Sequence, residues 1–288
     1  MLYIFTAGVL WGTIGIFVKL LASLGADGNL TSFLRMLSAF VIMSTLALIK
    51  HGRNFFIHVH DKEIIIPCAL LGLVSHGLFN IFYTASIKIN GMAIACVLMY
   101  TAPVFTALAS KLLFHEKFTG LKISALIINI LGCVLTVTGG NIFNNDNLSL
   151  IGILAGIGSG FGYGMAAIFG KSAGEKTDAL IISAYSYFFA MIFLLIFRTP
   201  DINFALANPK ILLMGILYGL IPTSLAYLVY YNGLQKIHDT SRVPVIASIE
   251  PVAAVLIGML IYNEEIGFAN FIGVAVVLVS IIIMVRAK

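Results

Sequence analysis

Residues 99–118 read MYTAPVFTALASKLLFHEKF, and the stretch recurs at residues 247–266 as ASIEPVAAVLIGMLIYNEEI. Each copy is an apolar run with an early proline and an acidic end. The offset of 148 positions is constant, and it extends upstream of both copies. The matching pairs are Tyr83 with Tyr231, Lys88 with Lys236, Ile89 with Ile237, Pro103 with Pro251, Val104 with Val252, Leu108 with Leu256, Leu112 with Leu260 and Glu116 with Glu264. Such self-similarity predicts a duplicated chain.

The composition points to a lipid environment. Hydrophobic residues make up 60% of the 288 residues and charged residues 10%, and the mean hydropathy is +1.05. A soluble domain has about 25% charged residues, so this chain cannot cover a globule with polar surface. The formal charge of +5 is spread thinly between apolar runs, which is typical of membrane orientation signals and argues against a nucleic-acid partner.

Neither the three cysteines nor the N-terminal run points to another class of protein. Cys68, Cys96 and Cys133 fall inside apolar runs without a Cys-x-x-Cys pair, which predicts buried small hydrophobes and no disulfide or zinc site. No metal or cofactor is expected. The first apolar run begins without a basic region or an obvious cleavage site, so we expect it to remain as a helix.

Ten runs are long enough to span a bilayer, for which a helix needs about 20 apolar residues. The connections between them carry Gly, Asn, Asp and Pro, and the longest leave no room for a soluble domain. The predicted spans are residues 2–22, 30–49, 64–86, 92–114, 121–138, 148–170, 179–197, 211–231, 243–262 and 267–285.

The distribution of Lys and Arg predicts that both termini are cytoplasmic, because cytoplasmic connections carry an excess of basic residues. With that orientation, the outer connections hold only Lys88, Arg198 and Lys210. The inner ones hold Lys50, Arg53, Lys62, Lys111, Lys117, Lys122, Lys171, Lys176, Lys236, Arg242, Arg286 and Lys288. The asymmetry also favours an even number of spans.

Orientation and duplication together predict the architecture. The halves are residues 1–142 and 148–288 with five spans each, so the second half enters the membrane from the opposite side. We therefore expect an all-α integral membrane protein of ten transmembrane helices in two inverted five-helix repeats, with a substrate site between the halves near mid-membrane. Glycines at every fourth position, Gly152 to Gly164 in the sixth span and Gly8 and Gly12 in the first, predict close helix packing.

Short motifs give these spans a family resemblance. Leu10-Trp11-Gly12 followed by Phe17-Val18-Lys19 resembles the first-helix signature of EamA-type members of the drug/metabolite transporter superfamily. The Pro103…Glu116 and Pro251…Glu264 segments resemble the end of each EamA repeat. The resemblance covers nearly the whole chain and implies a ten-helix inverted-repeat exporter of small metabolites, often amino acids or related compounds. The chain departs from a symmetrical pattern at Glu250, whose counterpart is Ala102.

Two polar positions inside spans are the strongest site candidates. Glu250 precedes Pro251 in the ninth span. A carboxylate inside a span costs a few kcal/mol on insertion, so its presence predicts a function. It could exchange a proton or pair with a cationic substrate group; the alternative is a packing role beside a Lys or hydroxyl. His76, Asn80 and Tyr83 share one helix face. His76 could bind a carboxylate or carry a proton, or it could simply be hydrogen-bonded to a neighbouring helix.

Aromatic residues and one arginine complete the predicted site. Aromatic side chains offer apolar area with a polar handle, which suits amino-acid-like solutes, although Tyr and Trp also line membrane interfaces. Arg35 could clamp a substrate carboxylate or reach the outer headgroups. Lys19 and Lys171 are expected to be orientation or gate charges. The aromatic candidates are Trp11, Tyr83, Tyr100, Tyr163, Tyr227 and Tyr231.

The charged loops are expected to be structural. His51, His58, His60 and Asp61 crowd one connection, but a His-x-His pair on a loop is weak evidence for a metal site. The acidic residues Glu116, Glu264 and Glu265 are expected to cap helix ends or pair with lysines, with Glu116 beside Lys117 as a solvated example.

The sequence therefore predicts a secondary-active inner-membrane transporter that exports amino acids or related small metabolites by alternating access, with protons as a possible coupling ion. Two alternatives stay open: efflux of cationic drugs or amines by proton antiport, with Glu250 as the anionic partner, and an intramembrane lipid-modifying enzyme. The second is disfavoured because the sequence shows no catalytic Ser/His/Asp set or Asp-rich motif.

Overall fold

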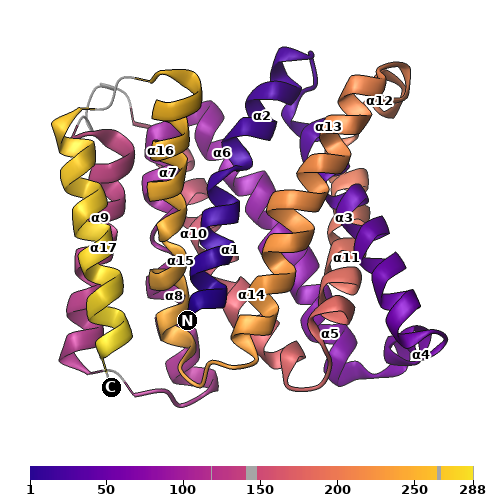
Figure 1. Cartoon of the computed structure of the whole chain (residues 1–288), viewed down its shortest axis with the longest axis horizontal. Helices are drawn as coiled ribbons and strands as arrows, with labels where there is room; N and C mark the ends of the chain where they lie inside the picture. The colour runs from indigo at the N-terminus through magenta and orange to yellow at the C-terminus, as the bar shows by residue number, and fades with distance from the viewer. Residues whose placement is uncertain (118, 141–147, 265–266, 288) are drawn as a thin grey trace.

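The computed structural model is one bundle of membrane-length helices (Figure 1). It describes residues 1–117, 119–140, 148–264 and 267–287, apart from the side chain at position 93. The predicted repeat boundary at residue 142, Glu265 and the last residue, 288, lie outside the described residues.

The ten predicted spans are confirmed within these residues, because ten helices are long and apolar enough to cross a membrane. Their ends differ from the predicted ones by only a few residues. They are Leu2–Ser23, Gly28–His51, Lys62–Asn90, Ile94–Leu113, Gly120–Thr138, Leu150–Gly174, Ala179–Arg198, Pro209–Leu234, Thr240–Tyr262 and Phe268–Arg286.

Five of the spans are not single regular helices. The first consists of α1 (Leu2–Gly12) and α2 (Ile14–Ser23), the third of α5 (Lys62–Leu70), η2 (Leu71–Leu78) and α6 (Phe79–Asn90), and the fourth of α7 (Met92–Met99) and α8 (Ala102–Leu113). The eighth consists of α13 (Pro209–Gly219), η3 (Leu220–Leu225) and α14 (Ala226–Leu234), and the ninth of η4 (Thr240–Arg242), α15 (Val243–Ala247) and α16 (Ile249–Tyr262).

The remaining spans are α3 (Gly28–His51), α9 (Gly120–Thr138), α10 (Leu150–Gly174), α11 (Ala179–Arg198) and α17 (Phe268–Arg286). Short helices lie in the two longest connections: α4 (Asn54–Ile57), η1 (His58–His60) and α12 (Ile202–Ala207).

Local sequence chemistry sets where the spans begin. Asp27 caps α3 by accepting a hydrogen bond from the Leu30 N–H at 2.8 Å. Asp178 caps α11 in the same way, accepting from the N–H groups of residues 180 and 181. A short polar side chain at this position satisfies amide donors that have no partner inside the helix. The Asp residues that the sequence places between apolar runs therefore start helices.

The irregularities recur at the 148-residue offset. η2 and η3 are π-helical, and they occupy equivalent positions in the third and eighth spans. The fourth span is interrupted after Met99 and the ninth after Ala247, which are also equivalent positions. In both of these spans the repeated proline, Pro103 or Pro251, falls in the first turn of the restarted helix, where a missing N–H costs little.

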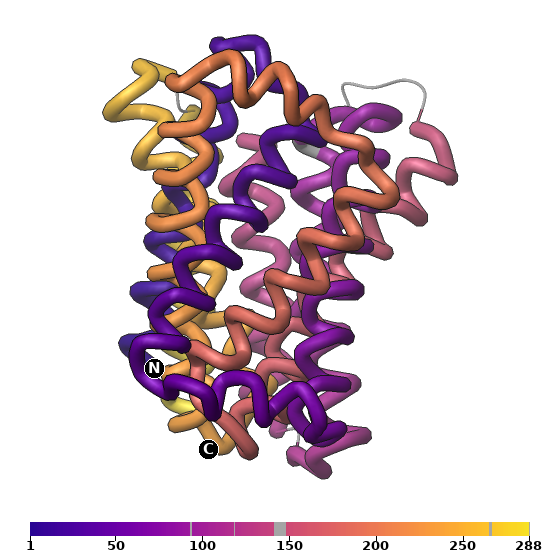
Figure 2. Tube along the Cα trace, turned by 90° about the vertical axis from the view of Figure 1, so that its right-hand side faces the viewer, coloured from indigo at the N-terminus to yellow at the C-terminus, as the bar shows by residue number. Residues whose placement is uncertain are grey.

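Both chain ends lie at the same end of the bundle (Figures 1 and 2). We call this end the terminal face. It carries the N-terminus, the connection after α3 and the end of α17. The distal face carries α12 and the start of α10. The first half thus enters the bundle at the terminal face and the second half at the distal face.

Glycines bring the two halves together at the interrupted spans. A Cβ atom on Gly164 of α10 would lie 2.6 Å from the Ala102 carbonyl oxygen, and one on Gly12 of α1 would lie 3.1 Å from the Glu250 carbonyl oxygen. A first-half span therefore packs on the break in the ninth span, and a second-half span packs on the break in the fourth. This contact confirms the close packing expected from the glycine spacing.

Candidate functional site

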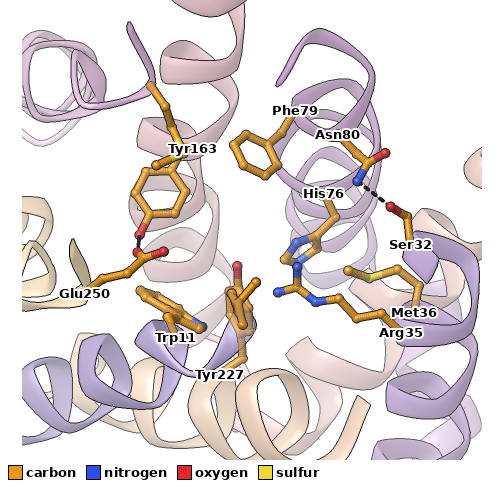
Figure 3. Close-up of a pocket in the computed structure, with 12 residues that line it drawn as sticks. Trp11, Ser32, Arg35, Met36, His76, Phe79, Asn80, Tyr163, Tyr227 and Glu250 are labelled. Carbon is orange, nitrogen blue, oxygen red and sulfur yellow. Dashed lines mark hydrogen bonds between the residues drawn. The ribbon is translucent and has the colours of Figure 1, made fainter. Parts of the chain in front are cut away.

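A small cavity lies between the two halves, near the middle of the spans (Figure 3). Its volume is about 50 Å³, which is room for about three water molecules. The lining residues come from α1, α2, α3, η2, α6, α7, α10, α14 and α16. They are Trp11, Ile14, Ser32, Arg35, Met36, His76, Phe79, Asn80, Met99, Tyr163, Tyr227 and Glu250.

Glu250 lies on one side of this cavity (Figure 3). Because the chain breaks at Ser248, Glu250 falls in the first turn of α16, where the exposed N–H groups favour negative charge. The Tyr163 hydroxyl of α10 donates a 2.6 Å hydrogen bond to the Glu250 carboxyl group. The break before the repeated proline therefore places this carboxyl group at a helix start, whereas a continuous span would place it in a helix interior.

Arg35 lies on the opposite side of the cavity (Figure 3). Its Nε donates to the Thr223 hydroxyl at 2.9 Å, and its guanidinium carbon lies 5.1 Å from the centre of the Tyr218 ring. Thr223 belongs to the π-helical η3, and its hydroxyl also donates to the Tyr218 carbonyl oxygen at 3.0 Å. Arg35 therefore points into the protein, where no carboxylate among the described residues lies within ion-pair distance of it.

His76 and Trp11 complete the polar lining. Both side chains are buried, at 3% and 4% exposed. Within the described part of the chain, neither the His76 Nε2 nor the Trp11 Nε1 has a hydrogen-bond partner. Tyr227 packs between them, with ring centres 5.0 Å from His76 and 4.9 Å from Trp11. Unpaired buried polar groups are costly, so these two atoms are suited to a ligand or to water.

Three of the predicted aromatic residues do not line the cavity. Tyr83 stacks on Phe79 and shares a 2.8 Å hydrogen bond with the Cys96 thiol. Tyr100 is buried, and Tyr231 is fully buried beside Tyr227. Neither Tyr100 nor Tyr231 therefore belongs to an interfacial belt. The other predicted site residues, Trp11, Arg35, His76, Asn80, Tyr163, Tyr227 and Glu250, all line the cavity.

Sequence reasoning missed five lining residues, namely Ile14, Ser32, Met36, Phe79 and Met99. A signal existed for two of them, because Ser32 lies one helical turn before Arg35 and Met36 lies one turn after Ser32. Ser32 also accepts a 2.8 Å hydrogen bond from the Asn80 amide, which joins α3 to the third span.

One prediction about the charged residues at the ends of the spans is wrong. Glu116 is not solvated beside Lys117: its side chain is 8% exposed and lies 3.3 Å from the Lys171 ammonium. It also accepts hydrogen bonds from the N–H groups of Thr240 at 2.7 Å and Ser241 at 3.0 Å. Neighbouring residues could not indicate this role, because the partners lie more than 50 positions away in the chain.

Comparison with known proteins identifies the family. The EamA-like transporter family matches residues 1–138 and again residues 150–286. An uncharacterized transporter of Archaeoglobus fulgidus is 26% identical over 97% of this chain and 94% of its own length. The uncharacterized inner membrane transporter YicL of Salmonella typhimurium is 22% identical over 99% of this chain and 94% of its own.

The fold has a solved counterpart as well. A crystal structure with 16% sequence identity superposes with a TM-score of 0.80, covering 98% of this chain and 94% of its own. The two family matches together span nearly all 288 residues, and the related proteins are named as transporters. The chain belongs to the EamA-like transporter family, within the drug/metabolite transporter superfamily, and is a multi-pass membrane transporter rather than an enzyme.

Proposed function

We propose that this transporter exports amino acids or closely related zwitterionic metabolites through the cavity between Glu250 and Arg35. The single observation that carries the proposal is the placement of these two opposite charges on opposite sides of one cavity, without an ion-pair partner among the described residues (Figure 3). A solute with an ammonium group for Glu250 and a carboxylate for Arg35 satisfies both. The unpaired His76 and Trp11 nitrogens add donors for the carboxylate.

The alternative, efflux of cationic drugs or amines, is less well supported. Trp11 and Tyr163 beside Glu250 would suit an organic cation. However, the guanidinium of Arg35 lines the same cavity and is always charged, so it would repel a solute that carries only positive charge.

Alternating access between inverted halves is part of the proposal. Support comes from the entry of the two halves at opposite faces, from the π-helical segments and breaks that recur at one offset, and from the two family matches. Such halves can open a central site to each face in turn. With the basic connections on the inside, the terminal face is cytoplasmic and the membrane is the cell's inner membrane.

Counterflow in proteoliposomes tests the substrate. Purified protein is screened with labelled amino acids, amines and nucleosides, and the transported class is then measured with Arg35→Gln and Glu250→Gln. A zwitterion requires both charges, so each variant is expected to reduce its uptake at least tenfold. Controls are Arg53→Gln and Glu175→Gln, which alter exposed residues outside the cavity. Amine transport that survives Arg35→Gln and fails with Glu250→Gln would support the cationic alternative and refute ours.

We further propose that Glu250 couples export to protons. Its carboxyl group is the acidic group that lines the cavity, and a proton and a substrate ammonium compete for the same oxygen atoms. Glu250→Gln is then expected to leave folding intact and to abolish the pH dependence of the flux that remains. A pH dependence equal to that of the wild type would refute the coupling role.

A further inference from the structure

Two ion pairs at opposite faces of the bundle are built in the same way. Lys171 of α10 pairs with Glu116 after α8, on the terminal face. Lys19 of α2 pairs with Glu264 after α16, on the distal face. Each pair joins a lysine of one half to a glutamate of the other, so an exchange of the halves turns one pair into the other.

The equivalence extends to the backbone around each glutamate. α8 and α16 are both followed, within two residues of their last residue, by a residue with positive φ, His115 at 54° and Asn263 at 50°. The following N–H, that of Glu116 or Glu264, bonds back to the carbonyl six positions earlier, at 3.4 and 3.2 Å. This is a common way to satisfy carbonyls at a helix end. It aims both glutamate side chains identically from their helices.

The lysines are equivalent as well. Lys19 ends the pattern Trp-Gly-x-x-x-Ile-Phe-x-Lys, and Lys171 ends Tyr-Gly-x-x-x-Ile-Phe-x-Lys. The Lys19 ammonium lies 4.1 Å from the centre of the Tyr262 ring, and the Lys171 ammonium lies 4.5 Å from that of Phe114. Tyr262 and Phe114 are themselves equivalent residues at the 148-residue offset. Each lysine therefore has the same two partners, an aromatic ring and a carboxylate.

The two pairs differ in burial and in additional bonds. The Lys171 and Glu116 side chains are 14% and 8% exposed, whereas Lys19 and Glu264 are both 51% exposed. Glu116 also accepts from two N–H groups at the start of the ninth span, and Lys171 donates to the His238 carbonyl at 2.8 Å. The equivalent start of the fourth span, α7, has no side-chain cap among the described residues.

We propose that Glu116 and Glu264 are two equivalent latches, one for each face. In the described conformation the terminal-face latch is closed, because Glu116 holds the start of the ninth span. The distal-face latch is open: Glu264 keeps its ion pair with Lys19, but among the described residues no side chain caps the start of α7. This rests on the alternating access proposed above. In the opposite conformation, Glu264 accepts from the N–H groups of residues 92 and 93 at the start of α7, while Glu116 releases Thr240 and Ser241. Each glutamate thereby stabilises the closed form of its own face.

The burial difference gives the direction of each effect. Glu116 makes charge-assisted hydrogen bonds shielded from water, so Glu116→Gln is expected to shift the equilibrium about tenfold toward opening of the terminal face. The exposed Lys19–Glu264 pair contributes less than about fivefold to the described conformation. Glu264→Gln therefore acts mainly on the opposite conformation and shifts the equilibrium back.

Spin-label distances measured by double electron–electron resonance test this without any substrate. Positions 113 and 236 report on the terminal face, and their equivalents 261 and 88 report on the distal face; all four residues are exposed. Labels are placed on a background in which Cys68, Cys96 and Cys133 are replaced. Glu116→Gln is expected to raise the ratio of terminal-face-open to distal-face-open protein about tenfold, and Glu116→Gln/Glu264→Gln is expected to return it toward the wild-type value.

Matched variants keep the test decisive. Lys171→Met should follow Glu116→Gln, Lys19→Met should follow Glu264→Gln, and Glu175→Gln should change nothing. Because Glu264 is half exposed in the described conformation, its variants can be read even if a Glu116 variant fails to fold. Equal shifts in one direction, or no shift, from the two glutamate variants would overturn the proposal. Opposite shifts in a protein that fails to transport amino acids would retain the latches and reject the proposed substrate.

Discussion

Replacing Asp239 by asparagine is expected to lower the thermal stability substantially. Asp239 lies just before the ninth span and pairs with Lys122, whose side chain is 6% exposed. It also accepts from the Ser241 hydroxyl at 2.5 Å and from the Arg242 Nε at 2.7 Å. Breaking a buried pair leaves an uncompensated charge at a cost of about 3–5 kcal/mol. Because Asp239 is 17% exposed, we expect about 3 kcal/mol, or roughly 6–12 °C in Tm.

The contribution of Asp239 to the stability of the fold is expected to decrease as the pH falls. Burial opposes the charge of Asp239, but the bonds from Lys122, Ser241 and Arg242 outweigh it and hold the pKa of this carboxyl well below its usual range. A carboxyl whose pKa is lower in the folded than in the unfolded protein stabilises the fold above about pH 4, and this contribution is lost as the pH falls further. The Tm advantage of wild type over Asp239→Asn should therefore shrink between pH 6 and pH 3.

Circular dichroism melting of detergent-purified protein measures both effects. The matched control is Asp201→Asn, because Asp201 caps α12 by accepting from the Phe204 N–H at 3.0 Å, and asparagine caps a helix equally well. A difference between wild type and Asp239→Asn of less than about 2 °C at pH 7 would refute the reasoning, as would a difference that stays constant on acidification.

Three further outcomes are expected. Thr223→Val removes the hydroxyl that holds the Nε of Arg35, so it should raise the KM of a zwitterionic substrate about tenfold in counterflow while amine uptake is unaffected. Gly164→Val should lower the Tm by several degrees, because its Cβ would approach the Ala102 carbonyl oxygen to 2.6 Å, whereas Gly15→Ala, which meets open space, should not. Although burial opposes its charge, Asp178 has a lowered pKa through bonds from Lys50, a backbone N–H and His51, so Asp178→Asn should flatten the loss of Tm below pH 4.

The sequence was sufficient to predict the ten spans and the sharing of one cavity by residues from both halves. Apolar runs set the spans, and an ionisable residue inside a run indicates an interior site because lipid excludes it. Rotation about the helix axis was harder to predict. Tyr100 and Tyr231 lie on the same spans as lining residues, yet they point into the protein core. An aromatic ring suits a core as well as a cavity wall, so residue type alone does not separate the two.

The irregular backbone could not be read from single residues. η2 contains Gly72 and Gly77 and η3 contains Pro222, but these residues mark an irregular helix without specifying a π-helix. The break at Ser248 precedes its proline by three residues.

The repeat contained more information than was used. Glu116 is equivalent to Glu264, and Lys19 and Lys171 occupy matching positions in the first and sixth spans. Together these matches suggest an ion pair for Glu116 in place of a solvated side chain.

The small size of the cavity indicates how the bundle must move. About 50 Å³ cannot hold an amino acid, and binding sites for small molecules usually measure about 300–1,000 Å³. Room has to come from spans that separate, and the interrupted spans, each of which lines the cavity, are the first, third, fourth, eighth and ninth. π-helical segments and helix breaks often mark points where a helix bends at a functional site. The uninterrupted α9 and α17, which pack against each other, contribute no residue to the lining. We therefore expect the substrate to be admitted by bending of these five spans while the α9–α17 pair stays fixed.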